Sequence, residues 1–272
     1  MVYINIIQHQ DYFMDSNFSP NNNKPSIQVI ERLLSLLDVL AANTNPVSLK
    51  KLSSITGLHP STAHRILNDL VSKRFAEKVE PGSYKLGIRL LELGNIVKSR
   101  INVREVSLPL MQLLHDKTQQ AVNLTLRRND EIVYIDRAFS EQSGIQVVRP
   151  LGGSAPLHLT STGKLFLSTE NSNSIKLYAS RTKLKGNNKN SITDYKILDK
   201  ELSNIKILGY ARDNEELEIG VKCIGAGIKD DSGKIVAGLS ISSPAERMND
   251  LWLNDLINAS ESISNILGYK LK

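Results

Sequence analysis

Cysteine is almost missing from this chain of 272 residues, which contains only Cys223. A disulfide within the chain is therefore impossible, and so is a zinc site built from several cysteines. The five histidines show no spacing typical of metal ligands, and we expect neither a metal nor another cofactor. A chain without disulfides suits a reducing compartment, so we expect a cytoplasmic location.

Long apolar runs are missing as well. No stretch reaches the ~18 uncharged apolar residues that can cross a bilayer, and residues 1–23 lack the basic start and continuous apolar core of a signal peptide. We therefore expect no membrane partner. The end of this tail is rich in Ser, Asn and Pro, a composition typical of disorder, and we interpret residues 1–25 as a disordered tail.

Signatures of catalysis are weak. Gly163-Lys164 does not form a phosphate-binding loop, because the earlier glycine is replaced by His158 and the following Ser or Thr by Leu165. Cys223 could act as a nucleophile with His158 as its base. A lone cysteine on an apolar strand is more often a small hydrophobic residue, so we predict no catalytic residue.

The positive charge is concentrated in one part of the chain. The chain has 34 Lys and Arg against 28 Asp and Glu, a net charge of +6. Residues 24–100 alone contain 12 basic and 6 acidic residues, whereas residues 1–23 contribute −2 and the remainder +2. A local excess of this kind favours a polyanionic partner such as DNA.

This basic segment has the pattern of two helices followed by a hairpin. Apolar residues at helical spacing predict a short helix over residues 49–56. Gly57 suits the turn, because glycine accepts a positive φ, and Pro60 suits the first turn of a second helix. Two short strands, 75–79 and 83–86, then predict a wing. The order is that of a winged helix-turn-helix; a plain helical corner with a solvated polar face is the alternative.

The exposed side of the second helix offers groups that can donate to base edges and phosphates. With two wing lysines, they form the predicted DNA-binding set of Ser61, Thr62, His64, Arg65, Asn68, Lys78 and Lys85. A further helix, starting near Ser26 as its N-cap, is predicted from the apolar stripe Ile27, Ile30, Leu33, Leu34, Leu37 and Leu40. We expect these parts to form a DNA-binding domain over residues 26–86, followed by a helical linker over 87–102. An ordinary domain helix is the alternative for the linker.

Beyond residue 102 the pattern predicts an α+β domain over residues 103–272. From residue 121 the apolar period changes to two, which is typical of strands. The expected strands are 122–126, 132–135, 145–148, 221–228 and 235–241, and the expected helices are 160–168, 195–207 and 251–267. We interpret residues 170–190 as a polar solvated surface and place Asp213 in a loop. Strands joined by hairpins and flanked by helices favour an antiparallel sheet.

Several polar residues accompany these strands. Ser161 and Thr162 lie at a predicted helix start, where free N–H groups favour a carboxylate or phosphate. Cys223, Ser240 and Ser242 lie on two neighbouring predicted strands, and the two serines share one face. This set can hold a small anion, or it can consist of satisfied core hydroxyls and helix caps. The spacing alone leaves both readings open.

Five runs of residues carry a family resemblance: TGLHPSTAHRIL, YKLGIRLLELG, APLHLTSTGK, GYARDNEELEIGVKCIGAG and AGLSISSPAERM. In this order and spacing they resemble the IclR-type bacterial transcriptional regulators, over nearly all of residues 26–268. The resemblance implies a winged helix-turn-helix, a linker helix and a GAF-like effector-binding domain. It also implies a homodimer or homotetramer that binds palindromic double-stranded operator DNA under the control of a small effector, often an organic acid.

The resemblance also implies which residues hold the effector: Ser161, Thr162, Asp213, Cys223, Ser240 and Ser242. Two departures from the family pattern concern this site. Ser161-Thr162 stands where smaller Gly or Ala residues are common, and residues 224–227 replace an Ala-Ala-Pro-like run. The first departure narrows the expected pocket, and the second suggests a different ligand or a weaker response.

We therefore predict a ligand-responsive transcriptional regulator, a repressor that senses a small organic acid and is not an enzyme. Two alternatives stay open at this point. One is a DNA-binding protein whose C-terminal domain only oligomerises. The other is an enzyme with an appended DNA-binding module.

Overall fold

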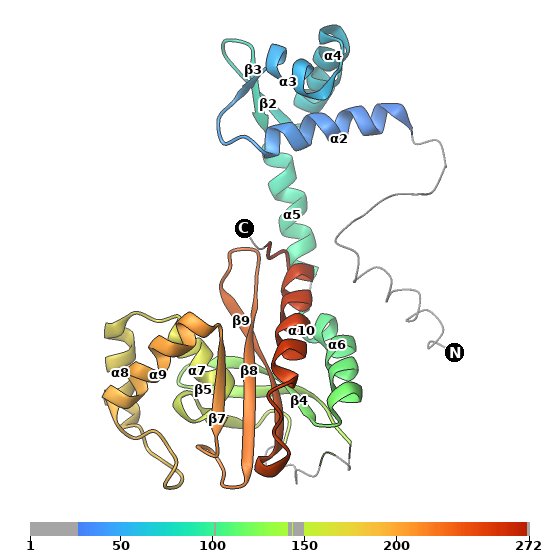
Figure 1. The fold of residues 1–272 in the computed structure, drawn as a ribbon. Helices are drawn as coiled ribbons and strands as arrows, with labels where there is room; N and C mark the ends of the chain where they lie inside the picture. Colours follow the sequence, from blue (N-terminus) through green and yellow to red (C-terminus); the bar gives the residue numbers. More distant parts are fainter. Residues whose placement is uncertain (1–26, 101, 141–142, 144–149, 271–272) are drawn as a thin grey trace. The chain divides into compact units, whose positions relative to one another are not determined.

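The computed structural model describes residues 27–100, 102–140, 143 and 150–270. The chain divides into two compact units, residues 1–100 and 101–272 (Figure 1). Three of our predictions lie outside the described residues: the disordered tail 1–25, the cap at Ser26 and the strand 145–148.

The first unit combines four helices with a small antiparallel sheet in its described residues. The helices are α2 (Gln28–Ala41), α3 (Leu49–Thr56), α4 (Pro60–Ser72) and α5 (Ile88–Arg100). The strands are β1 (Val47–Ser48), β2 (Ala76–Val79) and β3 (Ser83–Leu86), in the order β1-β3-β2. The succession of α3, α4 and the β2-β3 hairpin confirms the predicted winged helix-turn-helix.

Local chemistry explains the turn between α3 and α4. Gly57 ends α3 with φ of 67°, in the left-handed region that glycine adopts without a steric penalty. His59 caps α4 by accepting a hydrogen bond from the N–H of Ser61, and Pro60 is the first helical residue. Leu52 and Leu67, one from each helix, are fully buried in the core of this unit.

The buried face of α2 differs from the predicted stripe. Leu36 and Leu40 are buried, whereas Ile27, Ile30 and Leu34 are 64%, 49% and 51% exposed. The helix packs against α3, α4 and β3 on one side only, so its buried face is narrower than its apolar stripe. The wider stripe leaves apolar side chains at the surface of this chain.

Helix α5 begins as a direct continuation of the wing. The N–H of Gly87 donates to the carbonyl of Phe75 (2.8 Å), and that of Arg89 donates to the carbonyl of Arg74 (3.1 Å). A Cβ at Gly87 would lie 2.2 Å from the carbonyl oxygen of Arg74. Only glycine therefore fits at residue 87, where the backbone passes close to that of Arg74. Glu92 forms ion pairs with Arg74 and Arg89. The start of α5 is therefore tied to the first unit.

The second unit is built on one six-stranded antiparallel sheet, in the order β6-β5-β4-β9-β8-β7. Its strands are β4 (Ala121–Arg128), β5 (Glu131–Ala138), β6 (Ser154–Pro156), β7 (Tyr210–Asn214), β8 (Val221–Lys229) and β9 (Ile235–Pro244). Its helices are α6 (Val103–Thr118), η3 (Leu157–Leu159), α7 (Ser161–Ser168), α8 (Ser172–Thr182), α9 (Tyr195–Leu208), η4 (Ala245–Arg247) and α10 (Trp252–Ile266). This confirms an α+β protein with an antiparallel sheet.

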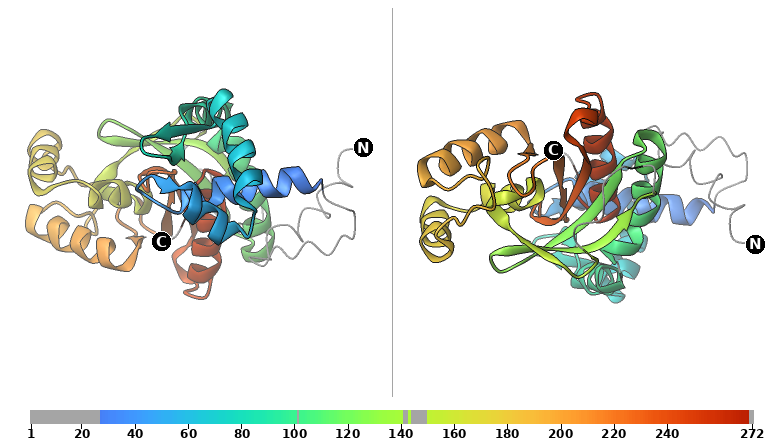
Figure 2. Two further views of the ribbon diagram at one scale, coloured as in Figure 1. Left: turned by 90° about the horizontal axis from the view of Figure 1, so that it is seen from above. Right: turned by 90° about the horizontal axis from the view of Figure 1, so that it is seen from below.

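The two faces of the sheet differ in chemistry. Helices α6 and α10 cover one face, and α7 packs against the other (Figure 2). The first face is apolar: Val122, Leu239 and Ile224, on three adjacent strands, are fully buried against Met111 of α6 and Leu256 of α10. The opposite face contributes Ile132 and Ala211 to a second apolar cluster with α7, but it also carries glycines and polar side chains, among them the predicted effector residues.

Two predictions about this unit were wrong. Asp213 lies on β7, paired with Cys223 of β8, and not in a loop. Ala211 is the only fully apolar buried residue of that strand, so its alternation is weak. The segment 170–190 contains α8, which buries Ile175 and Tyr178 and is more than a solvated surface. Because the segment is rich in Ser, Asn and Lys, its sequence pattern does not reveal that Ile175 and Tyr178 are buried.

No helix among the described residues is both long and apolar enough to cross a membrane.

Candidate functional sites

The predicted recognition face of α4 is open to solvent. Ser61, His64, Arg65 and Asn68 are exposed, and Thr62 is half-buried. Ser61 Oγ lies 2.8 Å from His59 Nδ1, the ring nitrogen that caps the helix. Arg65 has no ion-pair partner in the described part of the chain, and its guanidinium is available to an external acceptor.

The two wing lysines are exposed but have acidic neighbours. Lys85 Nζ lies 2.8 Å from Glu77 Oε2 on the adjacent strand, and Lys78 Nζ lies 4.0 Å from Glu80 Oε1. The hydrogen bond from Lys85 holds the pKa of the Glu77 carboxyl below its usual value. A phosphate that approaches Lys85 must therefore compete with this carboxylate.

Helix α7 starts directly on the polar face of the sheet. A Cβ at Gly225 would lie 2.9 Å from Ser161 Oγ, and one at Gly238 would lie 2.5 Å from the Cβ of Thr162. Glycine at both positions lets the first turn of the helix approach β8 and β9. Because Gly225 pairs with Ser240 across the strands, Ser161 lies over the strand position next to Ser240, on the same face of the sheet.

The two residues at the start of α7 have different surroundings. Thr125 Oγ1 donates to Thr162 Oγ1 (2.9 Å), which ties the helix to β4. The hydroxyls of Ser161 and Ser240 form no hydrogen bond with another described residue, and neither oxygen belongs to the fully enclosed side-chain atoms of the described chain, although the two residues as a whole are buried. Both hydroxyls are therefore available to form hydrogen bonds with a ligand.

The remaining predicted effector residues form a row across three strands. Asp213 pairs with Cys223, and Cys223 pairs with Ser242, in the register of β7, β8 and β9. Cys223 Sγ and Ser242 Oγ lie 3.1 Å apart, and Asn123 Nδ2 donates to Ser242 Oγ (3.1 Å). The structure thus brings the six predicted residues together on one face.

Comparison with known proteins decides the family. The model of the IclR helix-turn-helix domain matches residues 29–80, and the model of the bacterial transcriptional regulator IclR C-terminal domain matches residues 96–265. The chain belongs to the IclR family. The DNA-binding transcriptional repressor YiaJ of Escherichia coli is 27% identical over 252 residues, which cover 90% of this chain and 89% of YiaJ.

Solved structures share the fold of this IclR-family chain. The repressor BlcR of Agobacterium tumefaciens superposes with a TM-score of 0.78 at 24% identity and covers 91% of this chain and 100% of its own. An IclR homologue of Microbacterium hydrocarbonoxydans, complexed with 4-hydroxybenzoate, has a TM-score of 0.57 at 22% identity and covers 88% and 98%. As a member of this family, the chain is a DNA-binding transcriptional regulator.

The thiol and imidazole that suggested catalysis have other roles in this IclR-family chain. Burial and the neighbouring Asp213 raise the pKa of the Cys223 thiol, which keeps it protonated and unreactive. His158 Nδ1 lies 2.7 Å from the Tyr178 hydroxyl, and its Nε2 lies 3.1 Å from the carbonyl of Lys185. Both ring nitrogens are therefore occupied, and His158 is a buried structural residue.

Lys164 also has a structural role. It is fully buried, and its Nζ lies 2.7 and 2.8 Å from the two oxygens of Glu216 and 3.1 Å from Glu201 Oε1. These ion pairs neutralise a cation that would be costly to bury alone. Lys164 thus fixes α7 on the loop after β7 instead of holding a phosphate.

Asp213 has an unusual acidity. Burial, together with the negative charge of Glu216, raises the pKa of its carboxyl to about 7. Its Oδ1 accepts hydrogen bonds from the N–H groups of Glu216 (2.7 Å) and Leu217 (3.4 Å). Near neutral pH this side chain can accept a hydrogen bond from a ligand hydroxyl, or donate one to a carbonyl when protonated.

Three residues of the site escaped the sequence analysis: Asn123, Thr125 and Arg137. Asn123 and Thr125 alternate along β4 with the apolar Val122 and Leu124, so they share one face of the strand. This alternation could have identified them from the sequence. Arg137 Nε donates to Asn123 Oδ1 (2.5 Å). This contact follows from strand pairing, which the sequence pattern does not specify.

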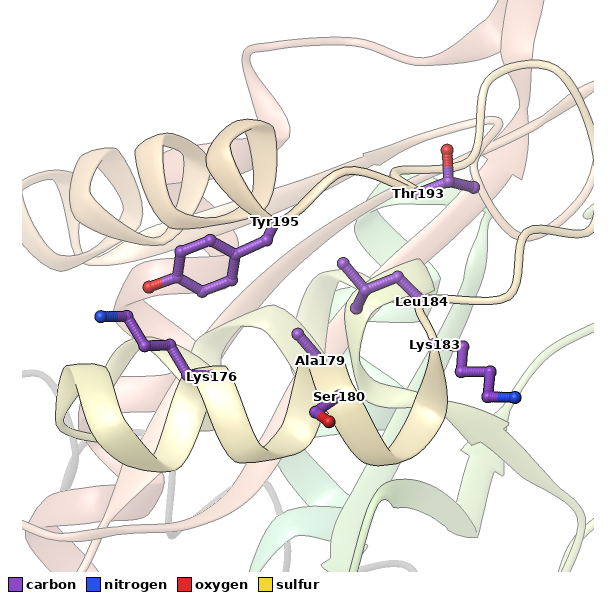
Figure 3. A pocket seen from close by; sticks show the side chains of 7 residues that line it. All are labelled: Lys176, Ala179, Ser180, Lys183, Leu184, Thr193 and Tyr195. Atoms are coloured by element: carbon purple, nitrogen blue, oxygen red, sulfur yellow. The ribbon is translucent and has the colours of Figure 1, made fainter.

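A separate surface pocket of about 330 Å³ lies between α8 and the start of α9 (Figure 3). Lys176 and Tyr195 face each other across it, and Leu184 lines its inner end. It contains none of the six predicted effector residues. Within the described ranges of the chain, no group of three or more His, Cys, Asp or Glu side chains could hold a metal ion.

Proposed function

We propose that the chain is a repressor that binds operator DNA as a homo-oligomer and releases it when a small organic acid binds the second unit. The observation that carries the acid-sensing part is the approach of the start of α7 to the sheet, where the hydroxyls of Ser161 on α7 and Ser240 on β9 form no hydrogen bond with another described residue. Two similar proteins, YiaJ and BlcR, are named repressors. Another family member binds 4-hydroxybenzoate, which is an acid.

The DNA-binding part of the proposal rests on α4 and the wing. Arg65 and Asn68 lie on the exposed side of α4, where they can reach base edges in the major groove. Ser61, Thr62 and His64 complete this surface near the helix start, and Lys78 and Lys85 contact phosphates. The protein acts in the cytoplasm, where bacterial DNA lies.

The proposed oligomer is at least a homodimer. A dimer reads two half-sites about 34 Å apart, one helical turn of DNA, whereas one α4 reads only one of them. The exposed apolar side chains of α5, Ile88, Leu91 and Ile96, are 45%, 58% and 46% exposed in the single chain. A second copy that covers them would remove this apolar surface from water. A monomer that binds operator DNA with full affinity in sedimentation experiments would contradict this assignment.

The proposed effector site places a carboxylate beside the start of α7. The N–H groups of Ser161 and Thr162 have no acceptor in the described part of the chain, and the helix dipole favours an anion there. Ser240 and Ser242 donate from the sheet. Asp213 repels a carboxylate when it is ionised, so it faces the hydroxyl or keto end of the ligand, next to Cys223.

The proposal is tested by measuring acid binding and DNA binding on the same protein. A thermal-shift panel of organic acids, with 4-hydroxybenzoate included, identifies an acid that binds, and calorimetry then measures its affinity. Ser240→Ala is expected to weaken acid binding about tenfold or more, because a ligand group loses its hydrogen-bond partner. DNA binding without acid is expected to stay as in the parent protein.

Ser180→Ala, an exposed serine of α8 in the same unit, is the matched control. Equal acid affinity of Ser240→Ala and the parent protein would remove the site from the proposed position. A panel in which no acid binds, with DNA binding intact, would favour a C-terminal domain that only oligomerises.

A further inference from the structure

Asn123 on β4 lies between Arg137 of β5 and Ser242 of β9, on the polar face of the sheet. Arg137 Nε donates to Asn123 Oδ1 (2.5 Å), and Asn123 Nδ2 donates to Ser242 Oγ (3.1 Å). Asn123 is only 3% exposed, whereas Ser242 is half-buried. Asn123 is not one of the six proposed effector residues, but it binds the hydroxyl of one of them.

The contact with Arg137 fixes the orientation of the Asn123 amide. A guanidinium group carries only hydrogen-bond donors, so the amide must turn its oxygen toward Arg137. A flipped amide would place its NH2 group against the Nε–H of Arg137 and its oxygen against Ser242. The amide nitrogen of Asn123 therefore faces Ser242, where it can only donate.

This orientation leaves the Ser242 hydroxyl with a proton to donate. The oxygen of Ser242 already accepts from Asn123, and Cys223 Sγ lies 3.1 Å from it. If Ser242 donates to this sulfur, the acceptor is a weak one that a ligand oxygen can replace. If the thiol donates to Ser242 instead, the Ser242 proton is uncommitted. In both arrangements Ser242 can donate its proton to a ligand.

The donor role of Ser242 selects among ligand groups. A carbonyl oxygen has lone pairs and no proton, so it accepts from Ser242. An ammonium group has only protons and cannot accept, whereas a ligand hydroxyl can take either role. The ligand group that suits Ser242 best is therefore a carbonyl oxygen.

We propose that Asn123 is a positioning residue that directs the Ser242 hydroxyl toward the effector, and that the effector is an organic acid with a carbonyl oxygen at this point. This inference rests on the proposed function, which places an acid beside Ser240 and Ser242. It adds a residue outside the predicted set and the class of the second polar group, which makes the effector a keto acid.

Asn123→Asp tests the direction of the hydrogen bond and nearly preserves the shape of the side chain. A carboxylate still accepts the N–H of Arg137, but it cannot donate to Ser242, so the Ser242 proton turns toward it. A keto acid then loses its donor, whereas a hydroxy acid can donate its own proton to Ser242. The added negative charge acts on both acids alike and cancels in the ratio of their affinities.

Calorimetry on the full-length protein compares matched acids: α-ketobutyrate, α-hydroxybutyrate and α-aminobutyrate, and phenylglyoxylate, mandelate and phenylglycine. In at least one series the parent protein is expected to bind the keto acid about tenfold or more tightly than the amino acid, a comparison that needs no variant. In Asn123→Asp the ratio of keto-acid to hydroxy-acid affinity is expected to fall about tenfold or more, because only the keto acid loses a hydrogen bond. Asn254→Asp adds a charge at an exposed position of α10 and should leave this ratio unchanged.

The thiol of Cys223 provides a measurement without any ligand. It is the only thiol of the chain, so the S–H stretching band of the infrared spectrum belongs to this residue. Asn123→Asp draws the Ser242 proton away and changes the hydrogen bonding at Cys223 Sγ, so the band is expected to shift. Asn254→Asp should leave the band in place. A residue that only fills space at position 123 would not produce this difference between the two variants.

An unchanged affinity ratio in Asn123→Asp would overturn the inference, and so would a parent protein that binds the amino or hydroxy acid more tightly than the keto acid. If a keto acid binds in a manner that depends on Ser240 but not on Asn123, the proposed function survives and the role of Asn123 is rejected. If no acid binds here or in the wider panel, the acid-sensing function and the keto-acid effector are both rejected. An S–H band that does not shift in Asn123→Asp rejects the positioning of Ser242 by Asn123.

Discussion

Asp213 is predicted to make the stability of the second unit depend on pH. Its carboxyl has a pKa of about 7 instead of 3.8, because burial and the charge of Glu216 disfavour the ionised form. The folded state therefore holds a proton that the unfolded state has already lost. The associated stability is complete below about pH 4 and is lost as the pH rises to about 7. A shift of about three pH units corresponds to at most about 4 kcal/mol.

Asp213→Asn isolates this contribution. The amide keeps an oxygen that can accept the N–H of Glu216, a bond of 2.7 Å in the structure, but it does not ionise. We expect the variant to be more stable than the parent protein at pH 8 by about 1–4 kcal/mol. We expect the difference to approach zero as the pH is lowered to 4. Urea denaturation at a series of pH values measures it.

Asp116→Asn, which removes an exposed carboxylate from α6, controls for the loss of one surface charge. If Asp213→Asn is less stable than the parent protein at pH 8, the ionised carboxylate of Asp213 does not lower the free energy of unfolding. If the difference is the same from pH 4 to pH 8, proton uptake by Asp213 is not its cause. Either result refutes the reasoning.

Three further predictions concern DNA binding and the packing of α7 on the sheet. Arg65→Ala should weaken operator binding by about 1–3 kcal/mol in a titration at fixed salt, with Lys189→Ala in the other unit as the control. Equal affinities of Arg65→Ala and the parent protein would exclude a contact between Arg65 and the DNA. Lys85→Ala should flatten the salt dependence of binding without changing sequence preference, and an unchanged slope would mean that Glu77 keeps this lysine from the DNA. Gly238→Ala should destabilise the protein by about 1–3 kcal/mol and weaken acid binding, because the new Cβ meets Thr162 at 2.5 Å; an unchanged melting temperature would show that α7 can shift freely.

The first unit was largely predictable because its signals are local. Gly57 and Pro60 mark the end of one helix and the start of the next, and each acts through its own backbone. The extent of the buried face of α2 was not predictable. Leu34 and Leu36 are both apolar, and only the position of the neighbouring helices decides that Leu36 is buried and Leu34 exposed.

The proposed effector site was predictable in part from the sequence, and the rest of it depends on strand register. Ser161, Ser240 and Ser242 were recognisable as hydroxyls at a helix start and on one strand face. Their closeness depends on the pairing of Gly225 with Ser240, and residue spacing does not specify which strands are neighbours. The same holds for Arg137, which reaches the site only because β5 lies beside β4. Asp213 was assigned to a loop because a short edge strand has little apolar alternation.

The central claim is that an acid bound in the second unit lowers the affinity of the first unit for DNA. Fluorescence anisotropy measures this directly, using DNA that the protein recovers from genomic fragments and the acid that binds best. The account predicts salt-dependent binding without acid and a loss of affinity of about tenfold or more with saturating acid. In Ser240→Ala this response should require about tenfold or more additional acid. DNA affinity that is unchanged at saturating acid in the parent protein would contradict the account.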